Sequence, residues 1–179
     1  VVGIVSDRDL KEASPSKATT LDVHELYYLL SELKVKDIMS RKIYAINPLD
    51  TVEKAAVIML EHRVTGIPVV EDGRLVGILS QGDVFRVLTT ITGIYRGGTL
   101  FAFSLEDRPG SIKEVADIVR KHGGRLVSII TSYEMCEEGC RNVSIRIADM
   151  PEDKVKALQE ELEREFTLLH VSHDELGDI

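Results

Sequence analysis

Val76-Gly77-Ile78-Leu79-Ser80-Gln81-Gly82-Asp83 is the stretch that decides the fold, because most of it also stands near the start of the chain. The earlier copy is Val2-Gly3-Ile4-Val5-Ser6-Asp7-Arg8-Asp9. Glycine, two aliphatic residues, serine, two variable residues and aspartate recur at the same spacing, which indicates an internal repeat. A short apolar run bounded by glycine predicts a buried strand, and the Ser-x-x-Asp that follows it predicts the start of a helix.

Each Ser-x-x-Asp segment combines two features that suit a ribose and its phosphate. The free N–H groups of a helix's first turn can hold an anion, and a carboxylate can accept hydrogen bonds from hydroxyl groups. Asp9 and Asp83 can also be N-cap residues that bind nothing. Because the pattern recurs in two copies, we favour a ligand-binding role for Asp9 and Asp83, and for Ser6 and Ser80 beside them.

The later copy belongs to a longer pattern, since Ile67-Pro68-Val69-Val70-Glu71-Asp72-Gly73-Arg74-Leu75 precedes it. Together these segments resemble the second half of a CBS domain, a ligand-sensing module that works in tandem pairs (Bateman-type). The resemblance implies one complete repeat over residues 35–92. Only two residues precede Gly3, so we expect residues 1–34 to hold the C-terminal part of a truncated first repeat and a linker helix.

Periodicity predicts the elements of the complete repeat. A strand is expected at 43–46, a hairpin turn at Asp72-Gly73 and a closing helix at 82–91. A helix after Asp50 should turn five side chains inward: Val52, Ala55, Ala56, Met59 and Leu60. Upstream, residues 14–20 read as a polar linker, and Asp22 with Glu25 predicts a capping box. The helix that it opens has an apolar face that we expect to be core, formed by Leu26, Tyr27, Leu30 and Leu33.

CBS domains hold an adenosyl ligand in the cleft between paired repeats, so the resemblance implies site residues in both copies. Adenine would lie against Ile46-Asn47-Pro48 and Thr65-Gly66-Ile67-Pro68, the ribose on Asp83, and the phosphate near Ser80. Equivalent roles in the first copy fall to Asp9 and Ser6, and Arg8 could reach a phosphate. Gly66 and Pro68 can equally form a tight turn into a strand, so both interpretations stay open. AMP, ADP, ATP and S-adenosylmethionine are the expected regulatory ligands, and no cofactor or metal is expected.

A different pattern begins after a connector that contains Gly93, Gly97 and Gly98. This connector is either slack or pinned to one domain. Residues 98–176 then predict strand, helix, strand, strand, helix, strand, the βαββαβ order of ferredoxin-like domains. Residues 142–147 alternate strictly, so Val143, Ile145 and Ile147 should face the opposite way from Ser144 and Arg146. The predicted fold class is therefore α+β (α/β).

The loop Asp107-Arg108-Pro109-Gly110-Ser111 resembles the first loop of an ACT domain, whose Asp-x-Pro-Gly signature binds small ligands, usually amino acids. Gly110 permits close approach, and the first N–H groups of the next helix can receive a carboxylate. Pro-Gly before a helix is also ordinary turn chemistry, so tight packing or a dimer contact stays open. A CBS pair followed by an ACT domain resembles the AcuB-type acetoin utilisation proteins.

Composition narrows the class of protein. A net charge of -8 argues against general affinity for nucleic acid or an anionic membrane. No apolar run approaches the roughly 20 residues that span a bilayer, so we expect a cytoplasmic protein. Four Asn and Gln residues against 29% charged residues are typical of thermophile proteins. Cys136 and Cys140 should be free thiols, although a hyperthermophile source would make a disulfide plausible.

No nucleophile with a base, phosphate-binding lysine loop or metal-ligand spacing appears, so we expect no enzyme. His170 and His173 come nearest to a metal pair, but on a strand they point to opposite faces. The expected function is regulatory sensing of an adenosine nucleotide, with an amino acid as a possible ligand of the ACT domain. The alternative is a dimerisation or interaction module without a ligand that regulates a partner enzyme. A homodimer is expected, because Ile129-Ile130 and Leu168-Leu169 put aliphatic side chains on both strand faces.

Overall fold

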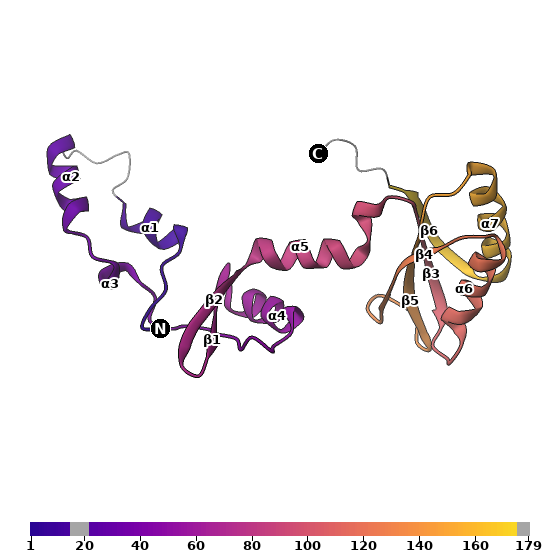
Figure 1. The fold of residues 1–179 in the computed structure, drawn as a ribbon, viewed down its shortest axis with the longest axis horizontal. Helices are drawn as coiled ribbons and strands as arrows, with labels where there is room; N and C mark the ends of the chain where they lie inside the picture. The colour runs from indigo at the N-terminus through magenta and orange to yellow at the C-terminus, as the bar shows by residue number, and fades with distance from the viewer. Residues whose placement is uncertain (15–21, 175–179) are drawn as a thin grey trace. The chain divides into compact units, whose positions relative to one another are not determined.

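The computed structural model describes residues 1–14 and 22–174, and the chain divides into two compact units, Val1–Phe85 and Arg86–Ile179 (Figure 1). The elements of the first unit are α1 (Asp7–Ala13), α2 (Val23–Glu32), α3 (Val35–Ile38), α4 (Val52–His62), β1 (Gly66–Glu71) and β2 (Arg74–Ser80). Helix α5 (Gln81–Thr92) contributes residues to both units.

A β-hairpin packed against α4 forms the centre of the first unit. Strands β1 and β2 pair antiparallel from Gly66↔Ser80 to Glu71↔Arg74. The turn residues Asp72 and Gly73 have φ angles of 48° and 76°, the pair of positive values that an Asp-Gly hairpin turn requires. The predicted turn is therefore confirmed. The core of this unit consists of Ile46, Ala55, Met59, Ile67 and Val84.

The predicted strand at 43–46 is reduced to one parallel bridge, between Ile46 and Val69. The Ile46 N–H donates to the Pro68 carbonyl at 3.1 Å, and the Val70 N–H donates to the Ile46 carbonyl at 2.8 Å. A turn follows directly, in which the Asp50 N–H donates to the Asn47 carbonyl at 2.9 Å. The chain therefore leaves the sheet after a single residue pair.

The two repeated apolar runs are not buried strands, so that prediction is wrong. Ile78 is 65% exposed and Val2 is 82% exposed. The hairpin has two strands only, and α4 covers the face that carries Ile67 and Leu79. Within the described part of the chain, no helix or strand covers its other face, so side chains there, such as Ile78, are exposed to solvent. Leu60, predicted to face inward from α4, is also 73% exposed.

Helix α2 has its predicted start but not its predicted burial. The Asp22 N–H donates to Glu25 Oε2 at 3.4 Å, which is half of a capping box. Tyr27 is 69% exposed and Leu30 is 38% exposed, and neither belongs to a hydrophobic core. The expectation that this apolar face is core is therefore wrong for Tyr27, Leu30 and Leu33, whereas the side chain of Leu26 lies outside what the structure describes. The linker predicted over 14–20 lies outside the described residues except for Ser14.

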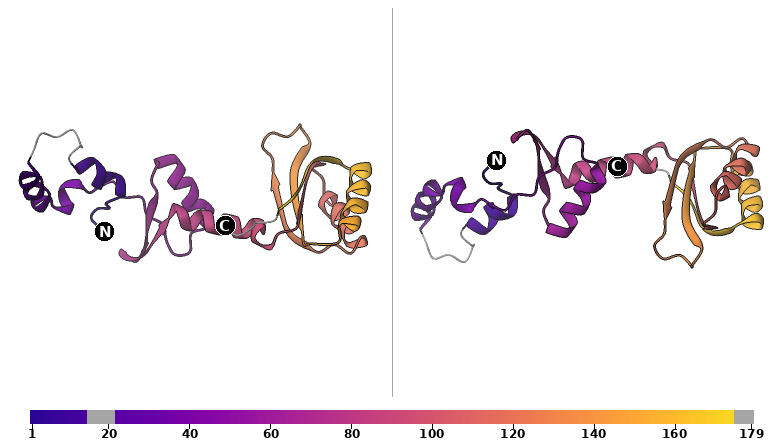
Figure 2. Two further views of the ribbon diagram at one scale, coloured as in Figure 1. Left: turned by 90° about the horizontal axis from the view of Figure 1, so that it is seen from above. Right: turned by 90° about the horizontal axis from the view of Figure 1, so that it is seen from below.

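The second unit is an antiparallel sheet of order β4-β5-β3-β6 with two helices on one face (Figures 1 and 2). After the 3-10 turn η1 (Ile94–Arg96), its elements are β3 (Thr99–Glu106), α6 (Ser111–Lys121), β4 (Leu126–Ser132), β5 (Cys140–Ile147), α7 (Glu152–Glu165) and β6 (Thr167–His173). The predicted order of six elements is the observed order. Its core consists of Phe101, Phe103, Leu105, Val115, Val119, Val143, Ile145, Ile147, Leu158 and Leu162.

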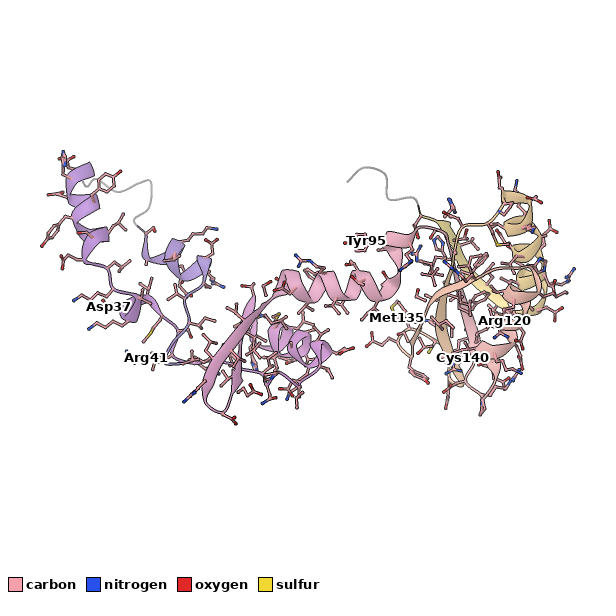
Figure 3. The ribbon with its side chains drawn as sticks, in the orientation of Figure 1. Asp37, Arg41, Tyr95, Arg120, Met135 and Cys140 are labelled. Atoms are coloured by element: carbon pink, nitrogen blue, oxygen red, sulfur yellow. The ribbon has the colours of Figure 1, made fainter. Side chains whose placement is uncertain are left out.

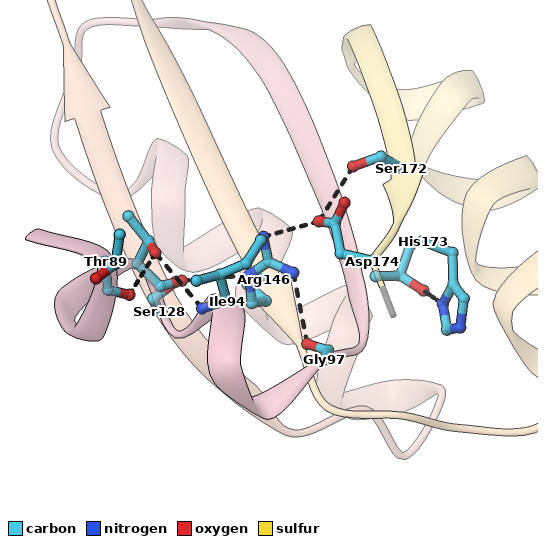
Figure 4. A network of polar contacts seen from close by, with 10 residues as sticks. Thr89, Ile94, Gly97, Ser128, Arg146, Ser172, His173 and Asp174 are labelled. Carbon is cyan, nitrogen blue, oxygen red and sulfur yellow. Dashed lines mark hydrogen bonds and ion pairs between the residues drawn. The ribbon is translucent and has the colours of Figure 1, made fainter. Parts of the chain in front are cut away.

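Arg146 lies on the sheet face opposite the helices, as predicted, yet it is only 3% exposed (Figure 4). Its guanidinium donates to the Thr92 carbonyl at 3.2 Å, to the Gly97 carbonyl at 3.4 Å and to Asp174 Oδ2 at 2.9 Å. Ser128 Oγ donates to the same Thr92 carbonyl at 2.7 Å. The glycine-containing connector is therefore held against the second unit, and its interpretation as a slack tether is wrong.

Candidate functional site

The two Ser-x-x-Asp segments fold into the same local structure. The N–H and Oγ of Ser6 both donate to Asp9 Oδ2, at 2.7 and 2.6 Å. Those of Ser80 donate to Asp83 Oδ2 at 2.9 and 2.5 Å. In both cases the aspartate N–H donates back to the serine Oγ. Each segment is thus a capping box with aspartate at the third helical position, so the aspartates are not N-cap residues.

These hydrogen bonds favour an ionised Asp9. Donation by the Ser6 side chain, and then by its backbone N–H, lowers the pKa of the Asp9 carboxyl below its ordinary value. Within the described residues, both bonds are accepted by Oδ2. The charged carboxylate can therefore still accept a hydrogen bond from a ligand through Oδ1.

A pocket of about 590 Å³ joins three segments of the first unit. The segment before α1 is held in place by a bridge in which Ile4 and Ser40 exchange N–H···O=C bonds of 3.0 and 2.9 Å. The polar and aromatic residues of the wall are Ser6, Asp7, Arg8, Asp9, Glu12, Ser40, Lys42, Tyr44, Arg63 and Thr65. Its remaining residues are Ile4, Val5, Val64, Gly66, Pro68 and Ile78. The pocket therefore combines the aspartate of the first copy with the segment of the second copy that was predicted to contact adenine.

Half of the residues predicted for nucleotide binding meet in this pocket: Ser6, Arg8, Asp9, Thr65, Gly66 and Pro68. The other half do not line it: Ile46, Asn47, Pro48, Ile67, Ser80 and Asp83. Ile46 and Ile67 are 7% and 0% exposed and belong to the core of the first unit, and their contact with adenine stays a prediction. Asn47 caps a turn instead, because its Oδ1 accepts from the Leu49 N–H at 3.1 Å.

The Arg8 Nε donates to Glu12 Oε1 at 2.8 Å, and both side chains are largely exposed, so the contact of Arg8 with a phosphate stays a prediction. Ten residues of the pocket wall were not predicted as site residues, among them Lys42, Tyr44 and Arg63. Tyr44 stacks on His62 with 3.7 Å between ring centroids, and Lys42 Nζ lies 5.3 Å from the Tyr44 centroid. No sequence motif marks these residues, since the pocket arises from contacts between distant segments.

The loop at residues 107–111 stands beside a second pocket, of about 620 Å³. Arg108 and Ser111 line it, with the acidic residues Glu106, Glu114, Asp117 and Glu165. The Arg108 guanidinium donates to Glu106 at 2.8 Å and to both Glu114 oxygens at 2.8 and 2.7 Å. These carboxylates, Glu114 first, raise the pKa of Arg108 and so favour its charged form. The role of the loop in binding a carboxylate stays a prediction. Asp107, Pro109 and Gly110 are not among the lining residues.

The thiols are free, as predicted, and Cys136 Sγ donates to the Cys140 carbonyl at 3.2 Å. They stand at the tip of the β4–β5 hairpin, where Met135 is 99% exposed (Figure 3). Among residues 1–14 and 22–174, no group of three or more His, Cys, Asp or Glu residues could hold a metal ion. The same residues contain no helix of the length and apolarity that crossing a membrane requires.

Two relatives of known sequence each match about a third of this chain. The uncharacterized protein MJ1426 of Methanocaldococcus jannaschii is 39% identical over 56 residues, 31% of this chain and 33% of that protein. The CBS domain-containing protein YhcV of Bacillus subtilis is 42% identical over 59 residues, 33% of this chain and 41% of that protein. The chain thus spans less than half the length of either relative.

A solved structure, of CBSX2 in complex with AMP, aligns over 51% of this chain and 64% of its own, with 34% identity and a TM-score of 0.38. The ACT-like and AcuB-like resemblances stay predictions. Residues 35–90 match the family model for the CBS domain. This segment holds α4, the β1–β2 hairpin and most of α5, and the family that it matches is the one that the repeated motif resembles.

Proposed function

We propose that the chain is a regulatory, non-catalytic protein that binds an adenosine nucleotide in the pocket between Asp9 and Thr65-Gly66. The observation that carries this proposal is that an ionised, hydrogen-bonded carboxylate and a glycine-containing strand start line one cavity. The volume of about 590 Å³ lies within the range of roughly 300–1,000 Å³ that is common for small-molecule sites.

The ribose contact falls to Asp9. A carboxylate accepts two hydrogen bonds from a diol, and here Ser6 holds the carboxylate through Oδ2 alone within the described residues. Asp83 has the same geometry but does not line the pocket. The ribose role expected for Asp83 is therefore proposed for Asp9 instead.

The base contact falls to Gly66 and its neighbours. A Cβ built on Gly66 would lie no closer than 3.8 Å to another atom, and Gly66 is not among the glycines with positive φ. Neither packing nor backbone conformation requires glycine there. Its missing side chain instead widens a pocket whose apolar wall includes Val64, Pro68 and Ile78. A flat base can rest on such a wall.

Isothermal titration of the whole chain with AMP and ATP tests this function. Asp9→Asn should weaken binding about tenfold or more, because a hydrogen bond to a charged group contributes about 1.5–3 kcal/mol. Asp83→Asn is the matched control, since it makes the same change in the same local structure outside the pocket. Binding that Asp83→Asn weakens and Asp9→Asn does not would refute the proposed site.

For residues 98–176 we propose an ACT domain of the ferredoxin-like class. The element order and the strand order β4-β5-β3-β6 support this proposal. An amino acid at the 107–111 loop is the ligand that the resemblance suggests. A titration with the twenty amino acids provides the measurement, and the absence of any binding would refute this ligand.

A homodimer is the second candidate function, and one observation favours it. Large apolar side chains are exposed on both units: Val57 at 57%, Phe85 at 57%, Ile91 at 53%, Ile130 at 39% and Leu169 at 54%. Contiguous exposed apolar surface is typical of protein interfaces. Light scattering at micromolar concentration should give twice the chain mass, and a monomer mass would exclude this candidate.

A further inference from the structure

We propose that the pocket of about 590 Å³ selects nucleotides that carry phosphate, and that Lys42 and Arg63 set this selectivity. The inference rests on the proposed function, because it names the class of ligand for the same pocket. Neutral adenosine compounds and the cationic sulfonium of S-adenosylmethionine would bind more weakly. The argument begins with the charges of the wall.

Six charged residues line the pocket, three acidic and three basic: Asp7, Asp9, Glu12, Arg8, Lys42 and Arg63. Two of the acids are paired with bases: Asp7 Oδ2 lies 2.5 Å from Lys11 Nζ, and Glu12 Oε1 lies 2.8 Å from Arg8 Nε. These pairs cancel. What remains is one negative charge at Asp9 and two positive charges, at Lys42 and Arg63.

Neither Lys42 nor Arg63 has a carboxylate at ion-pair distance among the residues that the structure describes. Both line the same pocket, and a chain of neighbours links them, because Lys42 lies over Tyr44, Tyr44 stacks on His62, and His62 precedes Arg63 in the chain. Two cations without a carboxylate partner that line one cavity attract an anionic group. Asp9, on another segment, is left for the ribose.

The backbone of Arg63 is a second, independent observation. Arg63 ends α4 with φ 53° and ψ 41°, the left-handed conformation that glycine usually supplies at a helix end. A residue with a side chain pays about 1 kcal/mol or more for this conformation. Such strained residues cluster at ligand sites, and here the strained residue brings a guanidinium to the pocket wall.

The chemistry of the two side chains fits a phosphate. Guanidinium and ammonium groups form charge-assisted hydrogen bonds to phosphate oxygens, and arginine can do so through two N–H groups at once. Each added phosphate increases the attraction to Lys42 and Arg63. The expected order of affinity is therefore ATP above AMP, and AMP above adenosine.

Isothermal titration of the whole chain with ATP, AMP, adenosine and S-adenosylmethionine tests the inference. Lys42→Met and Arg63→Gly should each weaken ATP binding about fivefold, the size expected for an exposed charge pair, and change adenosine binding less than about twofold. Arg63→Gly also relieves the left-handed strain, so its melting temperature should not fall below that of the wild type. Weaker binding in this variant cannot then be ascribed to unfolding.

Arg41→Gln is the matched control, since Arg41 is exposed nearby but does not line the pocket (Figure 3). It removes the same charge and should leave ATP affinity within about twofold of the wild type. Equal wild-type affinities for ATP and adenosine would overturn the selectivity inference and leave the nucleotide site standing. Failure of all four ligands to bind would overturn the proposed function itself, and the inference with it.

Discussion

Replacing Arg146 by methionine should destabilise the second unit by about 2–3 kcal/mol. Removing one partner of a buried ion pair generally costs about 3–5 kcal/mol, and the cost should be smaller here because this pair is partly solvated. Arg146 is 3% exposed and makes three hydrogen bonds, one of them to Asp174, whose side chain is 28% exposed. Asp174 can regain water after the change, and the Thr92 carbonyl keeps its bond from Ser128. Both effects place the cost at or below the lower end of that range.

Amide hydrogen exchange is the right assay, because it reports the opening free energy of each unit separately. Core amides of β3 and β5 should exchange faster in Arg146→Met by the factor that corresponds to the lost stability, and the amides of 93–98 should lose protection first. Arg120→Met is the control, since Arg120 is 62% exposed and pairs with Asp117 at 2.7 Å (Figure 3). Its cost should be at most about 1 kcal/mol. Equal destabilisation by the two variants would refute the role assigned to Arg146.

Three further predictions concern single positions. Gly98→Ala should lower the free energy of unfolding, measured in urea, by more than about 2 kcal/mol, because Gly98 has a φ angle of 89° and the added Cβ would lie 2.0 Å from the Ile147 carbonyl oxygen. Gly139→Ala is the control: its added Cβ would meet open space, so the loss should be about 1 kcal/mol. Hydrogen bonds from Lys121 and then His122 lower the pKa of Glu161 from 4.5 to about 2, so the stability it adds is complete above pH 4.5 and is lost as the pH falls towards 2. The melting temperatures of wild type and Glu161→Gln should therefore converge over that interval. Gly66→Ala should keep or raise the melting temperature yet weaken AMP binding in a titration, and unchanged binding would remove Gly66 from the pocket wall.

Local signals in the sequence predicted local structure well. Both Ser-x-x-Asp segments start helices, Asp72-Gly73 forms the hairpin turn, and residues 99–173 have the predicted order of elements. Each of these features depends on contacts between residues close in the chain, or on a periodic pattern within one element. They could therefore be inferred without knowledge of what packs against what.

Burial was predicted less well, because it depends on which faces other segments cover. Val143 and Arg146 alternate along β5 as expected, but both are buried, since the connector and Asp174 cover the second face. Ile78 shows the opposite error: an apolar strand residue whose face has no cover among the described residues. Lys42 and Arg63 could not be predicted as site residues, because they meet Asp9 only through the folded contacts of separate segments.

The most direct test of the nucleotide site is amide hydrogen exchange of the wild-type chain with and without saturating ATP. A bound ligand stabilises the amides around it. Binding at the proposed site predicts slower exchange at residues 4–12 and 63–68, with little change at 47–50 and in the second unit. Protection centred on residues 80–85 instead, with 4–12 unchanged, would contradict the assignment of the nucleotide to the Asp9 pocket.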